Sequence, residues 1–238
     1  MANPFESDKW NWGRKGRELR KINAQQAAKR VASIKPPSRS LAQDERYDAN
    51  IDHILRSAAA VFAEKSFGLA SIRDIAARAR ISFPRIYYYL RNKEELLYLI
   101  SRRAFEQLVA LADERMSATD DPEERLRLFI RSHLEYHMGN LAEMKVLVRE
   151  ADSLTGRYAA DITRLKREYS RICRRLLEGY AAHRNKTLDR EQTRILTSLL
   201  FGAMNWFYTW YDPARDYEQR SRIMDECFRM IAGTLSAR

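Results

Sequence analysis

The stretch from Ser71 to Glu94 constrains the fold of this chain more than any other. Its apolar residues recur at helical spacing in two short runs, which predicts two helices joined by a tight turn. Ser71, with Asp74 three residues later, is close to a capping box. Ser82 can cap the second helix, and Pro84 suits its first turn. The basic and aromatic side chains left outside this pattern indicate a helix-turn-helix, whose second helix enters the major groove of DNA.

This stretch resembles the DNA-binding domain of the TetR family of transcriptional regulators, and the resemblance covers roughly Tyr47 to Leu97. The order and spacing of short motifs carry it, namely Ile54-Leu55, Ala58-Ala59, Val61-Phe62, Ile75-Ala76, Ile81-Ser82, Ile86-Tyr87-Tyr88-Tyr89 and Asn92-Lys93-Glu94-Glu95-Leu96. The resemblance implies a three-helix DNA-binding domain, with a first helix expected from about Tyr47 to Glu64.

Three positions depart from the family pattern. Ser66 stands where a glycine commonly closes the first helix, and Gly68 can serve instead. Arg80 occupies the usual turn glycine, so we expect it to adopt a left-handed or bridge conformation. Pro84 replaces a residue that is often glycine at the start of the recognition helix.

The side chains expected to meet DNA divide into two groups. Arg73, Ser82, Phe83 and Arg85 are candidates for base edges, with Arg85 the best reader of guanine. Positions that match the family imply phosphate contacts for Tyr87, Tyr89 and Lys93, while one of the three consecutive tyrosines should pack into the domain core. The predicted DNA-binding residues are Arg73, Ser82, Phe83, Pro84, Arg85, Tyr87, Tyr88, Tyr89 and Lys93.

The rest of the chain predicts an all-α fold, because amphipathic stretches dominate and only 8 Gly and 6 Pro interrupt 238 residues. No apolar run approaches the ~20 residues that cross a bilayer, and a hydrophobic signal core is missing, so no membrane partner is expected. The two cysteines, Cys173 and Cys227, lie far apart, which favours a reducing cytoplasm over a disulfide framework. We therefore expect a cytoplasmic, nucleoid-associated bacterial protein.

Positive charge is concentrated before the predicted DNA-binding domain. The net charge is +11, and residues 1–43 hold 10 Lys/Arg against 3 Asp/Glu. This extension predicts added phosphate or minor-groove contacts, and the alternative is a solvated tail. It also contains Trp10, Trp12 and an amphipathic stretch over Arg17 to Ser33, whose thin, alanine-rich apolar face argues against a membrane-surface helix.

The expected domains are 1–43, a basic extension; 44–97, the helix-turn-helix; and 98–238, a helical ligand-binding and dimerisation domain. Helices are predicted over Lys93 to Met116, Pro122 to His137, Ala142 to Glu150, Tyr158 to Ala182, Arg190 to Trp210 and Tyr217 to Leu235. Gly202 suggests a close helix approach. The family resemblance implies that the last two helices form a four-helix homodimer interface, and an intramolecular core is the alternative. A homodimer would read a palindromic operator in double-stranded DNA.

An aromatic segment, Asn205 to Pro213, resembles the corresponding segment of TetR-family members that sense fatty acyl or other CoA thioesters. This implies an apolar tunnel with a basic mouth, for which Arg149, Arg157, Arg164 and Lys166 are candidates. The alternative is that these aromatic residues are core or dimer interface. The predicted ligand-binding residues are Phe129, His133, Tyr136, His137, Met144, Arg149, Tyr158, Asn205, Trp206 and Trp210.

Catalytic and metal-site motifs are missing from the sequence. His133 and His137 can share a helix face, but Glu135 is misplaced for a metalloprotease motif and no third ligand is evident, so neither a metal nor a cofactor is expected. We therefore predict a dimeric, ligand-responsive transcriptional regulator that acts as a repressor, and no enzyme. The effector would move the helix from Lys93 to Met116. The alternative is a TetR-like DNA-binding protein without a small effector, controlled by a protein partner.

Overall fold

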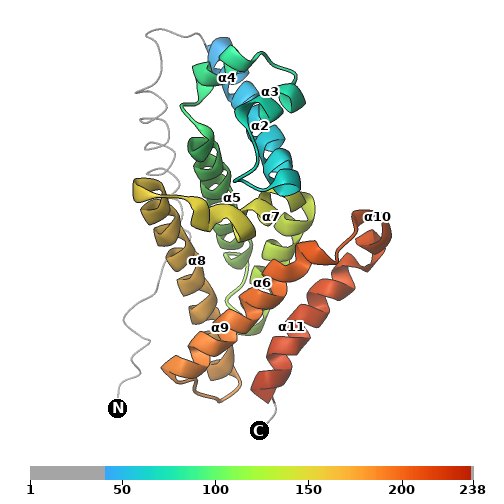
Figure 1. The fold of residues 1–238 in the computed structure, drawn as a ribbon. Helices are drawn as coiled ribbons and strands as arrows, with labels where there is room; N and C mark the ends of the chain where they lie inside the picture. The colour runs from blue at the N-terminus through green and yellow to red at the C-terminus, as the bar shows by residue number, and fades with distance from the viewer. Residues whose placement is uncertain (1–40, 237–238) are drawn as a thin grey trace.

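The computed structural model describes residues 41–236, and every regular element in that range is a helix, which confirms the all-α prediction (Figure 1). The first three helices form the upper end of the molecule in this view: α2 (Leu41–Lys65), α3 (Ile72–Ala79) and α4 (Phe83–Tyr89). The basic, tryptophan-containing extension, with its amphipathic stretch over Arg17 to Ser33, lies outside the described residues.

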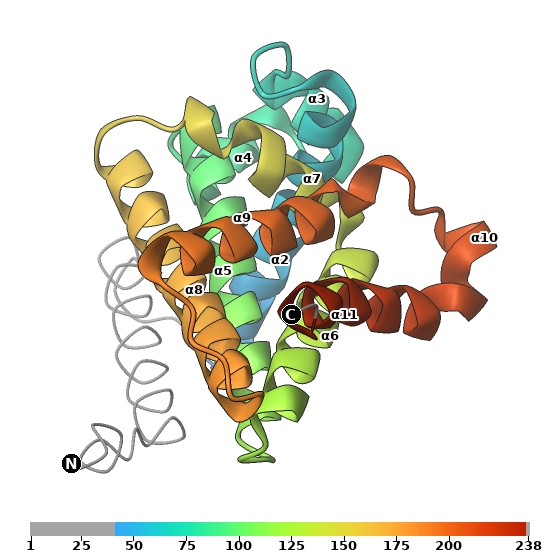
Figure 2. The ribbon, with the colours of Figure 1, turned by 90° about the horizontal axis from the view of Figure 1, so that it is seen from below.

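Helix α5 (Lys93–Met116) joins this upper unit to the rest of the chain, and its predicted bounds are confirmed. The Asn92 side chain accepts the Glu95 N–H, and two glutamates in the first turn complement the helix dipole. Seen from below, α5 lies at the centre of the molecule (Figure 2). It packs against α2 and against the three helices that follow it: α6 (Pro122–Gly139), α7 (Leu141–Glu150) and α8 (Gly156–His183).

The remaining helices lie across the lower front of the molecule in Figure 1. They are α9 (Arg190–Asn205), the 3-10 turn η2 (Trp206–Thr209), α10 (Pro213–Asp216), the 3-10 turn η3 (Tyr217–Gln219) and α11 (Arg220–Ser236). Earlier in the chain, a further 3-10 turn, η1 (Ala151–Ser153), precedes α8. Helix α9 starts at a capping box in which Asp189 and Gln192 exchange backbone-to-side-chain hydrogen bonds. Within the described residues, no helix is both long and apolar enough to cross a membrane.

Helix α9 ends earlier than predicted, because the last turn to Trp210 is a 3-10 turn rather than α-helix. Pro213 holds Asp212 in an extended conformation, which stops any continuation. The tighter turn lets Phe207 and Tyr211 both point inward and stack with ring centroids 4.4 Å apart. The last helix correspondingly starts as α-helix at Arg220, after η3, rather than at Tyr217.

The structure tests two expectations about glycine, and the one for Gly68 was wrong. Ser66 itself takes the left-handed conformation that closes α2, with φ of 68°, and Gly68 has no positive φ. Ser66 donates its N–H to the Phe62 carbonyl, so the helix-ending hydrogen bond is made at the serine. A Cβ added to Gly202 would meet no atom within 4 Å, so within this chain that glycine permits no close helix approach.

A single apolar core runs from the upper unit into the lower helices. Helix α2 packs on α5 and also on α7, so the helix-turn-helix is attached to the rest of the molecule at two places. Helix α5 continues without a break across residue 97, where the division between domains was expected. Because the two parts share a core, a displacement of α5 or α7 is transmitted to the upper unit.

Candidate functional site

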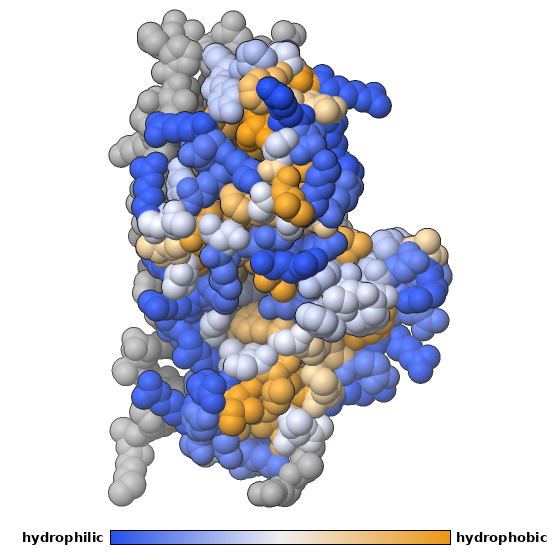
Figure 3. Space-filling view, in the orientation of Figure 1, coloured by the Kyte–Doolittle hydropathy of each residue, from blue (hydrophilic) through white to orange (hydrophobic). Residues whose placement is uncertain are grey.

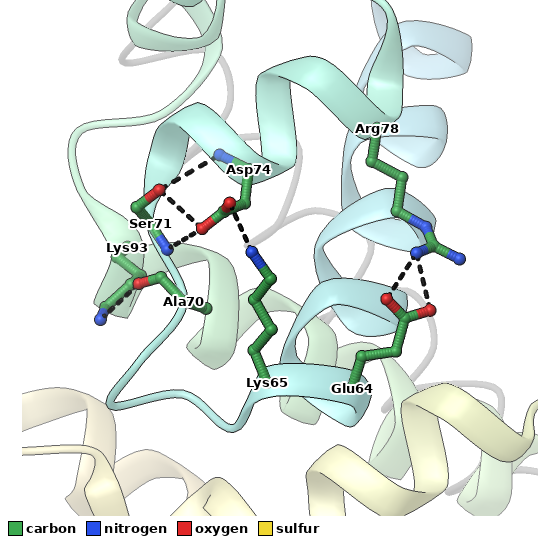
Figure 4. A network of polar contacts seen from close by, with 7 residues as sticks. All are labelled: Glu64, Lys65, Ala70, Ser71, Asp74, Arg78 and Lys93. Carbon is green, nitrogen blue, oxygen red and sulfur yellow. Dashed lines mark hydrogen bonds and ion pairs between the residues drawn. The ribbon is translucent and has the colours of Figure 1, made fainter.

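The first helix of the helix-turn-helix is fixed by a capping box, as the sequence predicts (Figure 4). The Asp74 carboxylate accepts the Ser71 N–H at 2.9 Å, and the Asp74 N–H donates to the Ser71 hydroxyl at 3.2 Å. The Lys65 ammonium lies 2.7 Å from the same carboxylate, to which the Ser71 hydroxyl also donates at 2.7 Å. Together with the Ser71 N–H, these contacts hold the pKa of Asp74 well below its usual range. The start of α3 is therefore tied to the end of α2.

The turn between the two helices is made by Arg80, which adopts the left-handed conformation expected of it, with φ of 53° and ψ of 40°. This conformation costs a residue with a side chain about 1–2 kcal/mol. Its N–H closes α3 on the Ala76 and Ala77 carbonyls, which offsets part of that cost. The Arg80 side chain is exposed, so the turn carries a positive charge where the family pattern has glycine.

Recognition helix α4 is anchored by one fully buried side chain, Ile86. Tyr89 packs against the core, which confirms that one of the three tyrosines faces inward. Tyr87 and Tyr88 are about half exposed, at 50% and 55%. Ser82 stands at the N-cap, but its hydroxyl makes no capping hydrogen bond, so its predicted capping role was wrong.

The outer face of α4 starts with an aromatic and cationic cluster. The Phe83 ring meets the Tyr87 ring edge-on at 5.3 Å, and the Arg73 guanidinium lies 5.7 Å from the Phe83 ring centre. Arg85 and Pro84 are exposed beside them. These side chains bring the predicted base-reading groups of α3 and α4 onto one surface, and their contacts with DNA stay predictions.

Lys93 occupies a different position from the one expected of a phosphate contact. Its ammonium donates to the carbonyl oxygens of Phe67 at 2.7 Å, Ala70 at 2.9 Å and Gly68 at 3.3 Å (Figure 4 draws the bond to Ala70). Lys93 therefore holds the loop between α2 and α3 onto the start of α5. The sequence carries no local signal of this arrangement, because the loop lies more than twenty residues earlier in the chain.

A cavity of about 370 Å³ lies among the helices below this unit, at the lower end of the range for small-molecule sites. Its walls come from α5, α6, α7, η1, α8 and α9. The lining residues are Phe105, Leu108, His133, Met144, Leu147, Val148, Ala151, Asp152, Leu154, Ala159, Ile162, Thr163, Lys166, Tyr169, Ser170, Phe201 and Asn205.

Three of the predicted ligand-binding residues line this cavity: His133, Met144 and Asn205. Phe129 is buried and does not line the cavity, but its ring contacts those of Tyr169 and Phe201, which do. Tyr169 and Phe201 were not among the predicted ligand-binding residues. Their helical spacing indicates burial, but burial alone does not distinguish a cavity wall from a filled core.

The other predicted ligand-binding residues lie elsewhere. The Tyr136 hydroxyl donates to Glu143, Tyr158 stacks on Tyr98 with ring centroids 4.4 Å apart, and Arg149 is exposed. Trp206 and Trp210 are exposed on η2 and at its end, with Trp206 63% accessible. Among the predicted basic mouth residues, Lys166 lines the cavity, whereas Arg157 and Arg164 are exposed and lie outside its lining.

His133 and His137 are both almost fully buried on α6, with ring centroids 6.1 Å apart. Burial lowers the pKa of His133 to about 3, and the neighbouring His137 adds to this lowering. Burial likewise lowers the pKa of His137 to about 4. Both imidazoles are therefore neutral near pH 7. Within residues 41–236, no cluster of three potential metal-ligating side chains is found.

A second, more open hollow of about 540 Å³ lies between α9 and α11. Its lining residues are Leu134, Ala203, Phe207, Trp210, Gln219, Arg222, Ile223, Glu226, Cys227 and Met230. Figure 3 shows apolar side chains gathered over these two helices with hydrophilic residues around them. Met230 in this lining, and Ile195 and Leu199 one turn apart on α9, are each more than 40% exposed.

Helix α5 is also linked by polar contacts to the start of α8, beside the cavity. The Glu94 carboxylate accepts the Thr155 N–H and the Thr155 hydroxyl, both at 2.8 Å. One turn later, the Tyr98 hydroxyl donates to Asp161 at 2.8 Å. Glu94 is in the first turn of α5, five residues after the last residue of α4, and Thr155 directly follows the cavity-lining Leu154. The recognition helix and the cavity are therefore joined by a short path.

Comparison with curated proteins gives relatives that regulate transcription. The HTH-type transcriptional activator FasR of Mycolicibacterium smegmatis is 28% identical over 108 residues, which are 45% of this chain and 48% of that protein. The HTH-type transcriptional repressor KstR2 of Mycobacterium tuberculosis is 34% identical over 87 residues, 35% of this chain and 44% of that protein. The chain thus spans about half the length of the curated relatives it matches.

Among solved structures, AibR in complex with isovaleryl coenzyme A and operator DNA shares the fold, with a TM-score of 0.66 and 23% identity over 76% of this chain and 97% of that one. The family model described as bacterial regulatory proteins, tetR family, matches residues 54–98. The model described as tetracyclin repressor-like, C-terminal domain, matches residues 119–232. These matches cover both the helix-turn-helix and the cavity-bearing helices, and the chain belongs to the TetR family of transcriptional regulators.

Proposed function

We propose that this protein is a homodimeric repressor that binds a palindromic operator in double-stranded DNA and is released by a small apolar effector such as an acyl-CoA thioester. The observation that carries the proposal is the cavity, because its wall includes the same helix, α5, that begins directly after the recognition unit. A ligand that moves this wall acts on the position of α4.

The chemistry of the cavity supports the effector class. About half of its lining surface is apolar, which suits burial of an acyl chain, at roughly 0.8 kcal/mol for each buried CH₂ group. Lys166 is exposed at the cavity, and Arg157 stands in the first turn of the same helix. These cations suit the phosphates of coenzyme A. AibR, which shares the fold, is solved with isovaleryl coenzyme A and operator DNA.

The proposed release follows from the position of α5. Phe105 and Leu108 of α5 line the cavity, and Glu94 at its first turn is hydrogen-bonded to Thr155 beside η1. An effector that pushes α5 and η1 apart shifts the helix-turn-helix of each subunit. Release requires the effector to bind the DNA-incompetent arrangement more tightly than the DNA-competent one.

The homodimer is proposed on the exposed apolar face of α9 and α11. Its apolar side chains, Ile195, Leu199 and Met230, are accessible in one chain and would be covered by the same face of a second. Gly202 of α9 is exposed, and a Cβ added to it would meet no atom of this chain within 4 Å. The backbone of a second subunit would therefore have room to approach α9 at this residue. A dimer presents two recognition helices to half-sites roughly 34–36 Å apart.

The alternative is a DNA-binding protein of this family that responds to a protein partner instead of a small effector. The solvent-connected cavity favours the small effector, because a protein partner would need no such space. The basic extension, residues 1–43, is where such a partner would be sought.

The proposal is tested by fluorescence anisotropy on labelled DNA from upstream of the protein's own gene, with a panel of acyl-CoA thioesters. We expect saturable release by at least one thioester. Ala159→Trp fills the cavity and should bind DNA but resist release, while Ala160→Trp, on the exposed neighbouring position, is the matched control. Release of both variants at the same thioester concentration would place the effector outside this cavity.

A further inference from the structure

Helix α8 changes in chemical character around its circumference where it forms one wall of the cavity. Ile162 and Tyr169, which line the cavity, are buried. Thr163, Lys166 and Ser170 also line it, but they are exposed or half-buried, so they stand at its mouth. Each residue of an α-helix advances about 100° around the axis, which places these three polar residues together, to one side of the two apolar ones. The wall therefore becomes polar toward solvent.

Three arginines continue this progression beyond the mouth. Arg174, Arg167 and Arg171 follow at about 80°, 100° and 140° around the axis from Lys166, on its polar side. All three are exposed, and within residues 41–236 none of them forms an ion pair. Their seven-residue separation spans about 10 Å along the axis, which accommodates more than one phosphate group. We call these three arginines the basic stripe.

The charges around the mouth are distributed unevenly. Among the residues that line the cavity, Asp152 of η1 is the one acidic side chain, so an anion that leaves the cavity is repelled there and attracted over α8. Arg164 lies outside the stripe, and its guanidinium donates to Asp161 at 2.9 Å and to Glu168 at 3.2 Å. Its charge is therefore already compensated. Glu178, one turn after the last arginine, ends the stripe.

We propose that the effector has a phosphorylated tail that leaves the cavity over α8, and that the basic stripe binds its phosphates. The inference rests on the proposed function, in which the effector is an acyl-CoA thioester, and it names the residues that recognise the nucleotide part. The acyl chain lies against the buried apolar residues, the pantetheine amides lie against Thr163 and Ser170, and the phosphates lie against the stripe. Arginine suits the last role because its planar guanidinium donates two parallel hydrogen bonds to a phosphate.

The position of the stripe argues against DNA as its polyanion. Recognition helix α4 lies at the upper end of the molecule in Figure 1, whereas α8 runs from the middle toward the lower end. The three arginines stand in the middle of α8, so DNA in contact with α4 lies away from them. Operator binding therefore serves as a control for the test.

Three probes separate the parts of the effector. Octanoyl-CoA has the acyl chain and the phosphates, octanoyl-pantetheine has the acyl chain without phosphates, and free coenzyme A has the phosphates without the acyl chain. Dissociation constants are measured by isothermal titration calorimetry for the wild type and for the stripe variant, Arg167→Gln/Arg171→Gln. The charge-matched control is Arg164→Gln/Arg184→Gln, which changes two exposed arginines of α8 and its C-cap outside the stripe.

We expect the stripe variant to bind octanoyl-CoA about 2- to 25-fold more weakly than the wild type, the factor for two exposed ion pairs. Its affinity for octanoyl-pantetheine should be unchanged, and the control should bind both compounds as the wild type does. Added salt should weaken the binding of octanoyl-CoA but not of octanoyl-pantetheine. Unchanged affinity of the stripe variant for octanoyl-CoA, an equal loss for both octanoyl compounds, or an equal loss in the control would overturn the inference.

The same titrations distinguish failure of the stripe from failure of the proposed function. If the wild type binds the two octanoyl compounds equally, the stripe fails and the apolar effector cavity remains. If neither octanoyl compound binds, but free coenzyme A binds the wild type and not the stripe variant, the stripe is supported and the acyl-CoA effector fails. If no probe binds, both fail.

Anisotropy titrations with the upstream DNA complete the test. The wild type and the stripe variant should bind this DNA equally. Weaker DNA binding by the stripe variant, together with unchanged affinity for octanoyl-CoA, would assign the stripe to DNA and refute the inference.

Discussion

The buried histidines predict a steep loss of stability in mild acid. His133 and His137 have folded-state pKa values lowered to about 3 and about 4 by burial, against about 6.5 for histidine in an unfolded chain. The unfolded chain therefore binds protons more readily than the folded one. For each histidine, the free energy of unfolding is unaffected well above pH 6.5 and falls as the pH drops below it.

The magnitude follows from these values. At pH 5.0, each histidine is almost fully protonated in the unfolded chain and still neutral in the folded one, which costs about 2 kcal/mol per residue relative to pH 7.5. The pair together predicts a loss of about 4 kcal/mol over this interval, a large part of the 5–15 kcal/mol of a typical domain. Carboxyl groups contribute little here, because their ordinary pKa values lie near 4.

The assay is urea denaturation followed by circular dichroism at pH 7.5 and pH 5.0, at one fixed protein concentration because a dimer's stability depends on it. The double variant His133→Gln/His137→Phe should lose far less stability than the wild type over this interval. His183→Gln, at the exposed end of α8, is the control and should behave as the wild type. If the wild type and the double variant lose the same free energy, the two rings do not carry the acid sensitivity.

Four further changes test other parts of the structure. Lys93→Met removes the ammonium from three carbonyl oxygens and should cost about 2 kcal/mol in urea denaturation, while unchanged stability would show that the loop does not need it. Arg85→Ala should weaken operator binding by about 1–3 kcal/mol in anisotropy titrations while leaving binding to unrelated DNA nearly unchanged. Leu199→Glu places a charge on the exposed apolar face and should give a monomer in analytical ultracentrifugation; a persistent dimer would exclude this face. Glu94→Ala removes both hydrogen bonds to Thr155 and should reduce effector-induced release of DNA. The affinity of the protein for the effector in the absence of DNA, measured by calorimetry, should change little.

Local signals predicted the starts of α3, α5, α6 and α9, but neither the end of α9 nor the tertiary contacts. Ser71 caps α3 through its near neighbour Asp74, so a few residues of sequence contain the whole interaction. Arg80 takes the left-handed conformation expected because that expectation concerns one residue of backbone. The partners of Lys93 lie on a loop far earlier in the sequence, and no local pattern points to them.

Only part of the cavity lining was predicted from the sequence, for a second reason. His133, Met144 and Asn205 were identified, but Phe105 and Tyr169 were not, because a helical apolar stripe has the same spacing whether it fills a core or lines a cavity. What separates the two is the volume left between five helices, which depends on all of their side chains together. Trp206 and Trp210 were predicted to bind the ligand, but both are exposed. A dense run of aromatic residues does not indicate which face of the turn each side chain occupies.

The cavity and the apolar hollow share two walls, and this links the effector to the proposed dimer face. On α6, His133 lines the cavity and the next residue, Leu134, lines the hollow. On α9, Phe201 and Asn205 line the cavity, and Ala203, between them, lines the hollow. An effector that displaces α9 therefore acts on the relative placement of the two subunits as well as on α5 within each. Both displacements change the separation of the recognition helices, so loss of the Glu94 contact should reduce the response without abolishing it.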